Sequence, residues 1–140
     1  MTTAIDSNIL VALWNEDDAL NTLARKALDA ALRRGSLVIA APVFAELLAS
    51  PSRGEAFLDA FFRDTGMSVD WELGETIWRT AGRAFQRYVM RRAKQPGSGP
   101  RRILADFLIG AHALQNGFRL LTLDDRLYAA AFPRLAIDTI

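Results

Sequence analysis

Four acidic side chains stand at positions where the surrounding sequence predicts little contact with solvent. Two of them directly follow apolar runs and two lie within apolar helical segments: Asp6, Glu46, Asp106 and Asp124. Carboxylates grouped away from water repel one another, because two like charges about 4 Å apart cost about 4 kcal/mol at an effective dielectric constant near 20. A hard divalent cation removes that repulsion, and ligation by oxygen alone favours magnesium or manganese. These residues are therefore candidates for a metal site.

The rest of the composition narrows the chemistry available to the chain. There is no cysteine, which excludes disulfide scaffolds, thiolate zinc sites and thiol nucleophiles. The single histidine, His112, excludes catalysis by two imidazoles acting as acid and base, and its apolar neighbours favour a packing role. A catalytic mechanism must then depend on carboxylates. Water activated by a metal would attack a phosphodiester in line and leave 5′-phosphate and 3′-hydroxyl ends.

The elements that must position these acids alternate between short strands and longer helices. Strands are expected at 2–5, 37–41, 67–70, 119–122 and 135–138. Helices are expected at 8–14, 15–34, 42–50, 54–64, 72–92, 102–116 and 124–132. A chain of 140 residues is about one domain, so residues 1–140 are assigned to a single α/β domain. Strands separated by helices predict a parallel sheet covered on both faces.

The predicted sheet brings the four acids together. Each belongs at the carboxyl end of a strand or in the first turn of the helix that leaves it, and sites of α/β sheets form at that edge. Three local signals add detail. Asn15 is expected to cap the second helix, and Thr122 with Asp125 fits a capping box. The stripe that begins at Ile103 and includes Asp106 is expected to face inward.

Basic residues are concentrated in one part of the chain. The formal net charge is +1, but residues 79–102 carry eight basic side chains and no acid, which leaves nine basic against sixteen acidic residues elsewhere. Arg79, Arg83, Arg87 and Arg91 recur every four residues and form one helical stripe. The segment Q-P-G-S-G-P follows at 95–100 and is expected to be a flexible surface loop. This distribution predicts an anion-binding surface beside the acids.

Three segments of the sequence resemble one known family. A-I-D-S-N-I-L near the start, R-I-L-A-D-F-L-I-G-A-H-A-L and L-L-T-L-D-D-R-L-Y are similar to the PIN-domain nucleases, and above all to the VapC type, the toxins of bacterial toxin–antitoxin pairs. The resemblance covers nearly the whole chain. It implies a three-layer α/β/α sandwich with a mostly parallel five-stranded sheet, Mg²⁺ or Mn²⁺ as cofactor, selective cleavage of RNA, a homodimer and a neutralising VapB-like antitoxin.

The resemblance also implies roles for the acids. Asp6, Asp106 and Asp124 would ligate one or two divalent ions, and Glu46 would be a further ligand or a base acting through water. All four would belong to the catalytic site.

Further residues around the acids receive supporting roles. The hydroxyls of Ser7, where the family commonly has threonine, and of Thr122 would hold water or orient carboxylates. Asp125 stands beside the fourth acid, and the T-x-D spacing favours Asp124 as the ligand.

Two basic residues stand directly before the third acid. Arg101 and Arg102 are expected to contact substrate phosphate because they precede Asp106. The arginine stripe at 79–91 suits either RNA or an acidic protein partner.

Several alternatives remain open at this stage. The fold could serve a non-catalytic binding module, an RNA-maturation enzyme or a nuclease that recognises DNA structure. A receiver domain or a dehalogenase-like phosphatase is disfavoured, because Lys26 and Lys94 are the only lysines and Asn8 stands where the phosphatase needs a second aspartate. No apolar run approaches about 20 residues and Asp6 interrupts any signal-peptide core, so no membrane contact and a cytoplasmic location are expected.

Overall fold

The computed structural model describes residues 1–50, 53–94 and 103–140. The strands are β1 (Thr2–Ile5), β2 (Ser36–Ala40), β3 (Ser68–Asp70), β4 (Arg119–Leu121) and β5 (Ile137–Asp138). The helices in this part of the chain are α1 (Ser7–Trp14), α2 (Asn21–Arg34), α3 (Ala41–Leu48), α4 (Glu55–Thr65), α5 (Glu75–Lys94), α6 (Leu104–Asn116) and α7 (Asp125–Ala131). The predicted alternation of strands and helices is confirmed.

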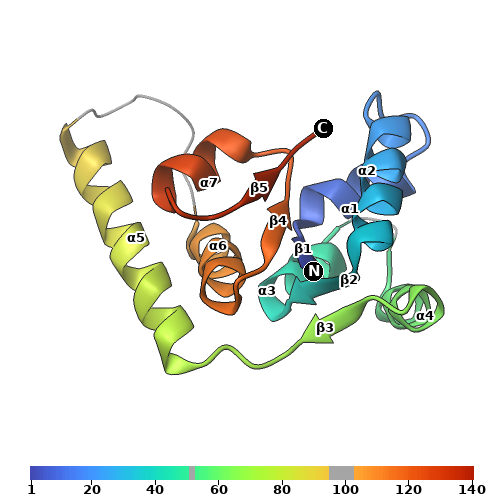
Figure 1. The fold of residues 1–140 in the computed structure, drawn as a ribbon, viewed down its shortest axis with the longest axis horizontal. Helices are drawn as coiled ribbons and strands as arrows, with labels where there is room; N and C mark the ends of the chain where they lie inside the picture. Colours follow the sequence, from blue (N-terminus) through green and yellow to red (C-terminus); the bar gives the residue numbers. More distant parts are fainter. Residues whose placement is uncertain (51–52, 95–102) are drawn as a thin grey trace.

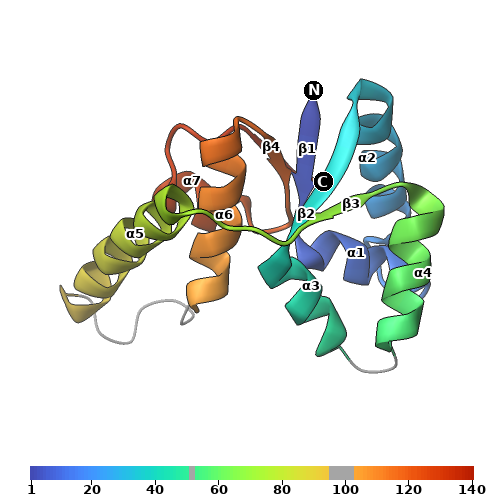
Figure 2. The same cartoon turned by 90° about the horizontal axis from the view of Figure 1, so that it is seen from below.

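The five strands form one parallel sheet in the order β3-β2-β1-β4-β5 (Figure 1). The central strand is β1, where Thr3 pairs with Leu37 of β2 and with Arg119 of β4. Helices α5, α6 and α7 lie on one side of the sheet, and α1, α2 and α4 lie on the other (Figure 2). The chain is therefore the three-layer α/β/α sandwich that was predicted, with a sheet that is parallel throughout.

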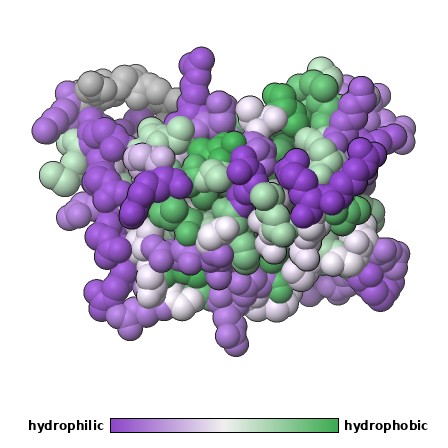
Figure 3. All heavy atoms as spheres, in the orientation of Figure 1, coloured by the Kyte–Doolittle hydropathy of each residue, from purple (hydrophilic) through white to green (hydrophobic). Residues whose placement is uncertain are grey.

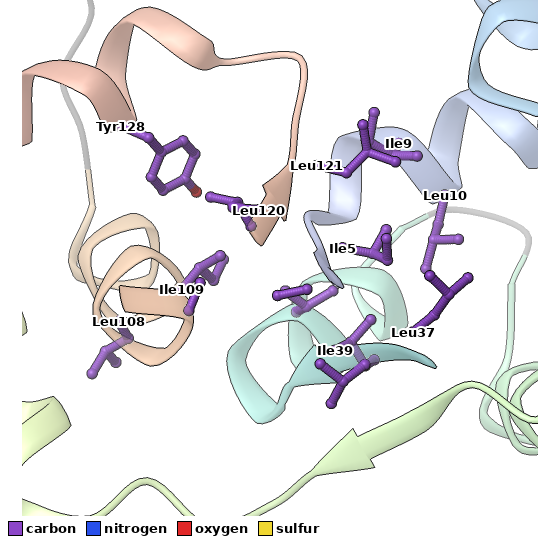
Figure 4. Close-up of a cluster of buried hydrophobic side chains, with 14 of the residues drawn as sticks. Ile5, Ile9, Leu10, Leu37, Ile39, Leu108, Ile109, Leu120, Leu121 and Tyr128 are labelled. Carbon is purple, nitrogen blue, oxygen red and sulfur yellow. The ribbon is translucent and has the colours of Figure 1, made fainter. Parts of the chain in front are cut away.

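The core lies where both faces of the sheet meet the helices. Ile5, Ile39 and Leu120 come from three adjacent strands and are almost fully buried (Figure 4). This burial on both faces explains why the strands read as continuous apolar runs. Helix α6 is buried over every residue from Phe107 to Ala113, so it is the inner helix of its layer.

A glycine allows α6 and α7 to pack closely. A Cβ atom at Gly110 would lie 2.3 Å from Cε2 of Phe132, which is closer than two carbon atoms can approach. Phe132 directly follows α7 and is buried. The missing side chain therefore lets the aromatic ring lie directly against the backbone of α6.

One helix begins later than predicted. The expected N-cap at Asn15 is wrong, because α2 begins at Asn21. Asn15 Oδ1 instead accepts a hydrogen bond from the amide of Asp17 at 3.1 Å, and Asp18 Oδ1 accepts one from the amide of Leu20 at 2.8 Å. Side chains of this type form turns with the backbone two residues further on, and such turns compete with the helix.

Two smaller expectations are also wrong. The capping box of Thr122 and Asp125 does not form, because Asp124 is the N-cap of α7 and the Thr122 side chain is engaged elsewhere. Ile103, placed on the inward stripe, is 57% exposed because it precedes the first turn of α6. The predicted loop at 95–100 lies outside the described residues. Within the described part of the chain, no helix is both long and apolar enough to span a bilayer.

Candidate functional site

Asp6 is the most deeply buried of the four predicted acids. It follows β1 directly, and its amide donates to the carbonyl oxygen of Leu121 at 3.0 Å, which ties it to the end of β4. Its Oδ1 accepts a hydrogen bond from the amide of Ser7 at 2.8 Å, so the carboxylate caps α1. The residue is only 4% exposed. The sheet and the helix cap together hold this carboxylate in one orientation.

The second oxygen of this carboxylate joins the ends of β1 and β4. Thr122 Oγ1 donates to Asp6 Oδ2 at 2.7 Å, and Asn8 Nδ2 lies 3.4 Å from the same oxygen. Asn8 Oδ1 in turn accepts from the amide of Leu123 at 3.1 Å. Thr122 therefore lies against the carboxylate that it was expected to orient. Asn8 was not predicted as part of the site, although an amide two residues after the first acid was a readable signal.

Glu46 reaches the same region from α3. Ser7 Oγ donates to Glu46 Oε1 at 3.0 Å, although the two residues are 39 positions apart in the chain. Ser7 thus contacts two acids: its amide binds Asp6 and its hydroxyl binds Glu46. Glu46 is half-buried. The serine joins the two carboxylates at the carboxyl ends of β1 and β2.

Asp106 contributes a third negative charge from the first turn of α6. Burial raises the pKa of Asp6 above its ordinary value, and the charge of Asp106 raises it further, although the hydrogen bonds from Thr122 and Ser7 act in the opposite direction. The pKa of Glu46 is also raised, first by burial and then by the charges of Asp6 and Asp106. The structure therefore brings three of the four predicted acids into mutual electrostatic contact. We call Asp6, Glu46 and Asp106 the acidic cluster.

Tyr128 of α7 adds a hydroxyl that sequence reasoning missed. Its ring points from α7 into the core beside α6 (Figure 4). Burial raises the pKa of Tyr128, and the nearby charges of Asp6 and Asp106 raise it further, so the phenol stays protonated. Its hydroxyl makes no hydrogen bond of regular geometry to the described residues. The residue was hard to predict because it lies one turn into an otherwise ordinary amphipathic helix.

The fourth predicted acid is connected to the cluster through the backbone. The amide of Asp124 donates to Thr122 Oγ1 at 2.9 Å, and the same hydroxyl donates to Asp6. Asp124 is half-buried, whereas Asp125 is exposed on the first turn of α7. Of the two neighbouring acids, Asp124 is the more buried, and its backbone is hydrogen-bonded to a residue of the predicted site.

The donor set suits a hard cation. The clustered side chains offer oxygen atoms alone, and three negative charges stand close together with two of their pKa values raised. Oxygen ligation of this kind is what Mg²⁺ and Mn²⁺ prefer. Within residues 1–50, 53–94 and 103–140, no three acidic or histidine side chains converge closely enough to enclose an ion as they stand. The residues fit a divalent cation by chemistry and charge, and binding requires the carboxylates to move closer together.

His112 is fully buried in α6, and its Nε2 lies 3.0 Å from Asp70 Oδ2 at the end of β3. It packs edge-on against Phe118, in keeping with the packing role expected for it. Arg101 and Arg102, expected to contact phosphate, lie outside the described residues.

The fold and the position of the acids define a class of protein. Residues 3–133 match the family described as PIN domain, and the chain belongs to that family. No curated protein matches the sequence.

Solved structures of the same fold include toxins of toxin–antitoxin pairs. VapBC2 from Rickettsia felis, bound to a DNA fragment from its promoter, is similar with a TM-score of 0.72 and 18% identity over 99% of this chain and 98% of that chain. VapBC-1 from nontypeable Haemophilus influenzae has a TM-score of 0.68 and 22% identity over 99% and 98%. VapC20 from Mycobacterium tuberculosis, described as a sarcin–ricin loop cleaving toxin, has a TM-score of 0.63 and 16% identity over 91% and 94%. At these identities the likeness concerns the fold.

Proposed function

We propose that this PIN-domain protein is a metal-dependent endoribonuclease that hydrolyses RNA phosphodiesters. The observation that carries the proposal is Asp6, a buried carboxylate that accepts hydrogen bonds from the neutral groups of Ser7 and Thr122. Its pKa is raised first by burial and further by the charge of a second acid, Asp106. Such an arrangement is unfavourable in the free protein and becomes favourable when a cation binds. Buried carboxylates that destabilise the free protein in this way are typical of catalytic and binding sites.

The residues of the proposed site have different roles. Asp6, Asp106 and Asp124 would hold Mg²⁺ or Mn²⁺, and the bound ion would activate a water nucleophile near neutral pH and offset the charge that develops on phosphate. Glu46 would complete the ligand set or accept a proton from water. Ser7 keeps Glu46 oriented through its hydroxyl, and Thr122 does the same for Asp6.

The wider role proposed is that of the toxin in a VapBC-type pair. The similar solved structures include complexes of toxins with their antitoxins, which supports a VapB-like antitoxin as partner for this chain. We further propose that the protein acts in the cytoplasm as a homodimer. The cleavage described for the toxin from Mycobacterium tuberculosis supports RNA as the substrate class.

The test is cleavage of an RNA panel by purified protein with Mg²⁺ or with a chelator. The wild type should cleave only with the metal and leave 5′-phosphate ends, because water is the nucleophile. Asp106→Asn should lower the rate by about 100-fold or more, since one charged ligand is lost. Asp125→Asn is the matched control and should cleave within about twofold of wild type, because its side chain is exposed.

Four outcomes would contradict the proposal. Cyclic 2′,3′-phosphate ends or cleavage in chelator would exclude the metal-dependent mechanism. Binding of RNA without cleavage would favour a non-catalytic module. Selective cleavage of branched DNA would favour a DNA-structure nuclease of the same fold.

A further inference from the structure

A second charged site lies between α5, α6 and the loop that follows α7. It is a cavity of about 210 Å³, and three arginines stand around it: Arg83 and Arg87 from α5 and Arg134 from the loop. No acidic residue is among the residues that line it in the described structure. We call these three arginines and the space between them the basic cavity.

The geometry divides the arginine stripe into residues with different surroundings. Arg79 is neutralised within its own helix, because its Nε lies 2.6 Å from Glu75 Oε2. Arg83 Nη2 contacts only a neutral group, Thr80 Oγ1 at 3.3 Å. Arg87 and Arg134 have no ion pair with any residue of the described chain. Three arginines without an ion pair to the described chain are therefore gathered at one concavity.

The residues at the base of the basic cavity are held by contacts between α5, α6 and the residue after α7. Thr80 is buried, and its hydroxyl also accepts a hydrogen bond from Gln115 Nε2 at 2.9 Å, which connects α5 to α6. Phe132 is held against Gly110 of α6, as described above. The arginines thus extend from a rigid base, and their forked donors match the oxygens of a phosphate group.

The basic cavity and the acidic cluster lie at opposite ends of α6. Asp106 is in the first turn of α6 and Gln115 is near its end, nine residues or about 14 Å further along the helix axis. In Figure 2 the last turn of α6 lies at the level of the start of β1, away from the strand ends where the acids gather. The surface over α5 is mostly hydrophilic in Figure 3. A strand of stacked nucleotides that spans both sites needs more than about four nucleotides, at about 3.4 Å each.

We propose that the basic cavity is a second contact for the RNA substrate, in which Arg83, Arg87 and Arg134 contact neighbouring backbone phosphates at a distance from the scissile bond. The identity of the ligand rests on the proposed function. An acidic protein segment is the other polyanion to consider, but peptides usually anchor through apolar side chains in a groove. The exposed lining of this cavity is mostly polar, although Leu114, Ala131, Phe132 and Pro133 also contribute to it.

The experiment is binding of a fluorescent single-stranded RNA of about 20 nucleotides, long enough to span both sites, measured by anisotropy in chelator. The variant Arg83→Gln/Arg87→Gln/Arg134→Gln should bind about 10-fold or more weakly, and the slope of log K against log salt should shrink by about 2, since three phosphate contacts are lost. Replacing the same three arginines by lysine should retain most of the slope, because the charge is kept. The control Arg25→Gln/Lys26→Gln/Arg33→Gln removes the same charge from the exposed surface of α2 and should bind within about twofold of wild type.

Three results would overturn the proposal. They are unchanged RNA binding in the first variant, an equal loss in the α2 control, and arginine-dependent binding of polyglutamate without arginine-dependent binding of RNA. Cleavage assays run in parallel separate this proposal from the proposed function. If the protein cleaves RNA but binding does not depend on these arginines, the basic cavity is not an RNA contact and the proposed nuclease function stands. If binding depends on the arginines but RNA is not cleaved, the RNA contact stands and the proposed nuclease function fails.

Discussion

Two aspartates at the ends of strands in one sheet have opposite environments. Asp6 follows β1, is buried, and has its pKa raised by burial and by Asp106. Asp138 ends β5 and forms two hydrogen bonds with Arg119, at 2.8 and 2.7 Å, with Arg34 3.3 Å away. Its pKa is lowered, first by the hydrogen bonds from Arg119.

The difference separates a carboxylate that serves the fold from one that serves chemistry. The guanidinium of Arg119 spans β4 and β5 and neutralises Asp138, so this acid stabilises the folded chain as it stands. Asp6 receives hydrogen bonds from neutral donors and faces other acids, so its charge costs stability until a cation arrives. The position of an aspartate after a strand does not reveal its role, whereas its partners do.

The largest effect should come from removing the unfavourable charge. Asp6→Asn in chelator should raise the free energy of unfolding by about 1–2 kcal/mol, because a buried charge among acids is lost. Mg²⁺ at about 100 times its Kd should stabilise wild type by about 2.7 kcal/mol and have little effect on the variant. Thermal unfolding with and without Mg²⁺ measures both. A variant that is less stable than wild type in chelator and gains equally from Mg²⁺ would remove Asp6 from the metal site.

A smaller effect of opposite sign should come from the paired carboxylate. Asp138→Asn should lower the free energy of unfolding by about 1 kcal/mol, because a bidentate ion pair near the surface is broken. RNA cleavage at saturating metal should stay within about twofold of wild type. Urea denaturation and initial cleavage rates are the measurements. Loss of cleavage without loss of stability would contradict a purely structural role for this residue.

The smallest effect is the pH dependence of stability, which should have opposite signs for the two aspartates. Because the pKa of Asp138 is lowered by folding, its stabilisation of the folded state is present above the pKa of the unfolded chain and is lost as pH falls through the pKa of the folded chain. The stabilities of wild type and Asp138→Asn should therefore converge below about pH 4. The raised pKa of Asp6 means that its penalty is absent at low pH and grows as pH rises through the folded value. Asp6→Asn should therefore gain over wild type as pH rises from about 4 in chelator. Urea midpoints measured across this range test both signs, and parallel curves for the two variants would contradict the comparison.

The sequence allowed most of the fold to be predicted, but its local signals were less reliable at helix starts. The apolar runs at Leu37 and Leu120 located buried strands because parallel strands covered on both faces need continuous apolar side chains. Asn15 misled the prediction, since an asparagine can cap a helix or form an isolated turn with the same side chain. Only the packing of α2 on α1 determined that the helix begins at Asn21, whose side chain donates to the carbonyl oxygens of Ala12 and Leu13.

The candidate site, like the fold, could be predicted from the sequence only in part. Sequence alone selected Asp6, Glu46 and Asp106, because acids beside apolar residues at strand ends and in first helical turns converge on one edge of the predicted sheet. It could not find Tyr128 or the basic cavity. Their neighbours come from segments far apart in the chain, and local periodicity contains no information about such contacts.

The order of residue types along the chain thus determined the sheet, the family and the acids that gather at one edge, because hydrophobic period and strand connectivity are properties of sequence. Tertiary structure decided which charges are neutralised. Whether Asp138 meets Arg119, Asp6 meets Asp106, or Arg87 and Arg134 meet across a cavity depends on how the layers pack in three dimensions. Charges interact through space over a few ångströms, and only the packed fold sets those distances.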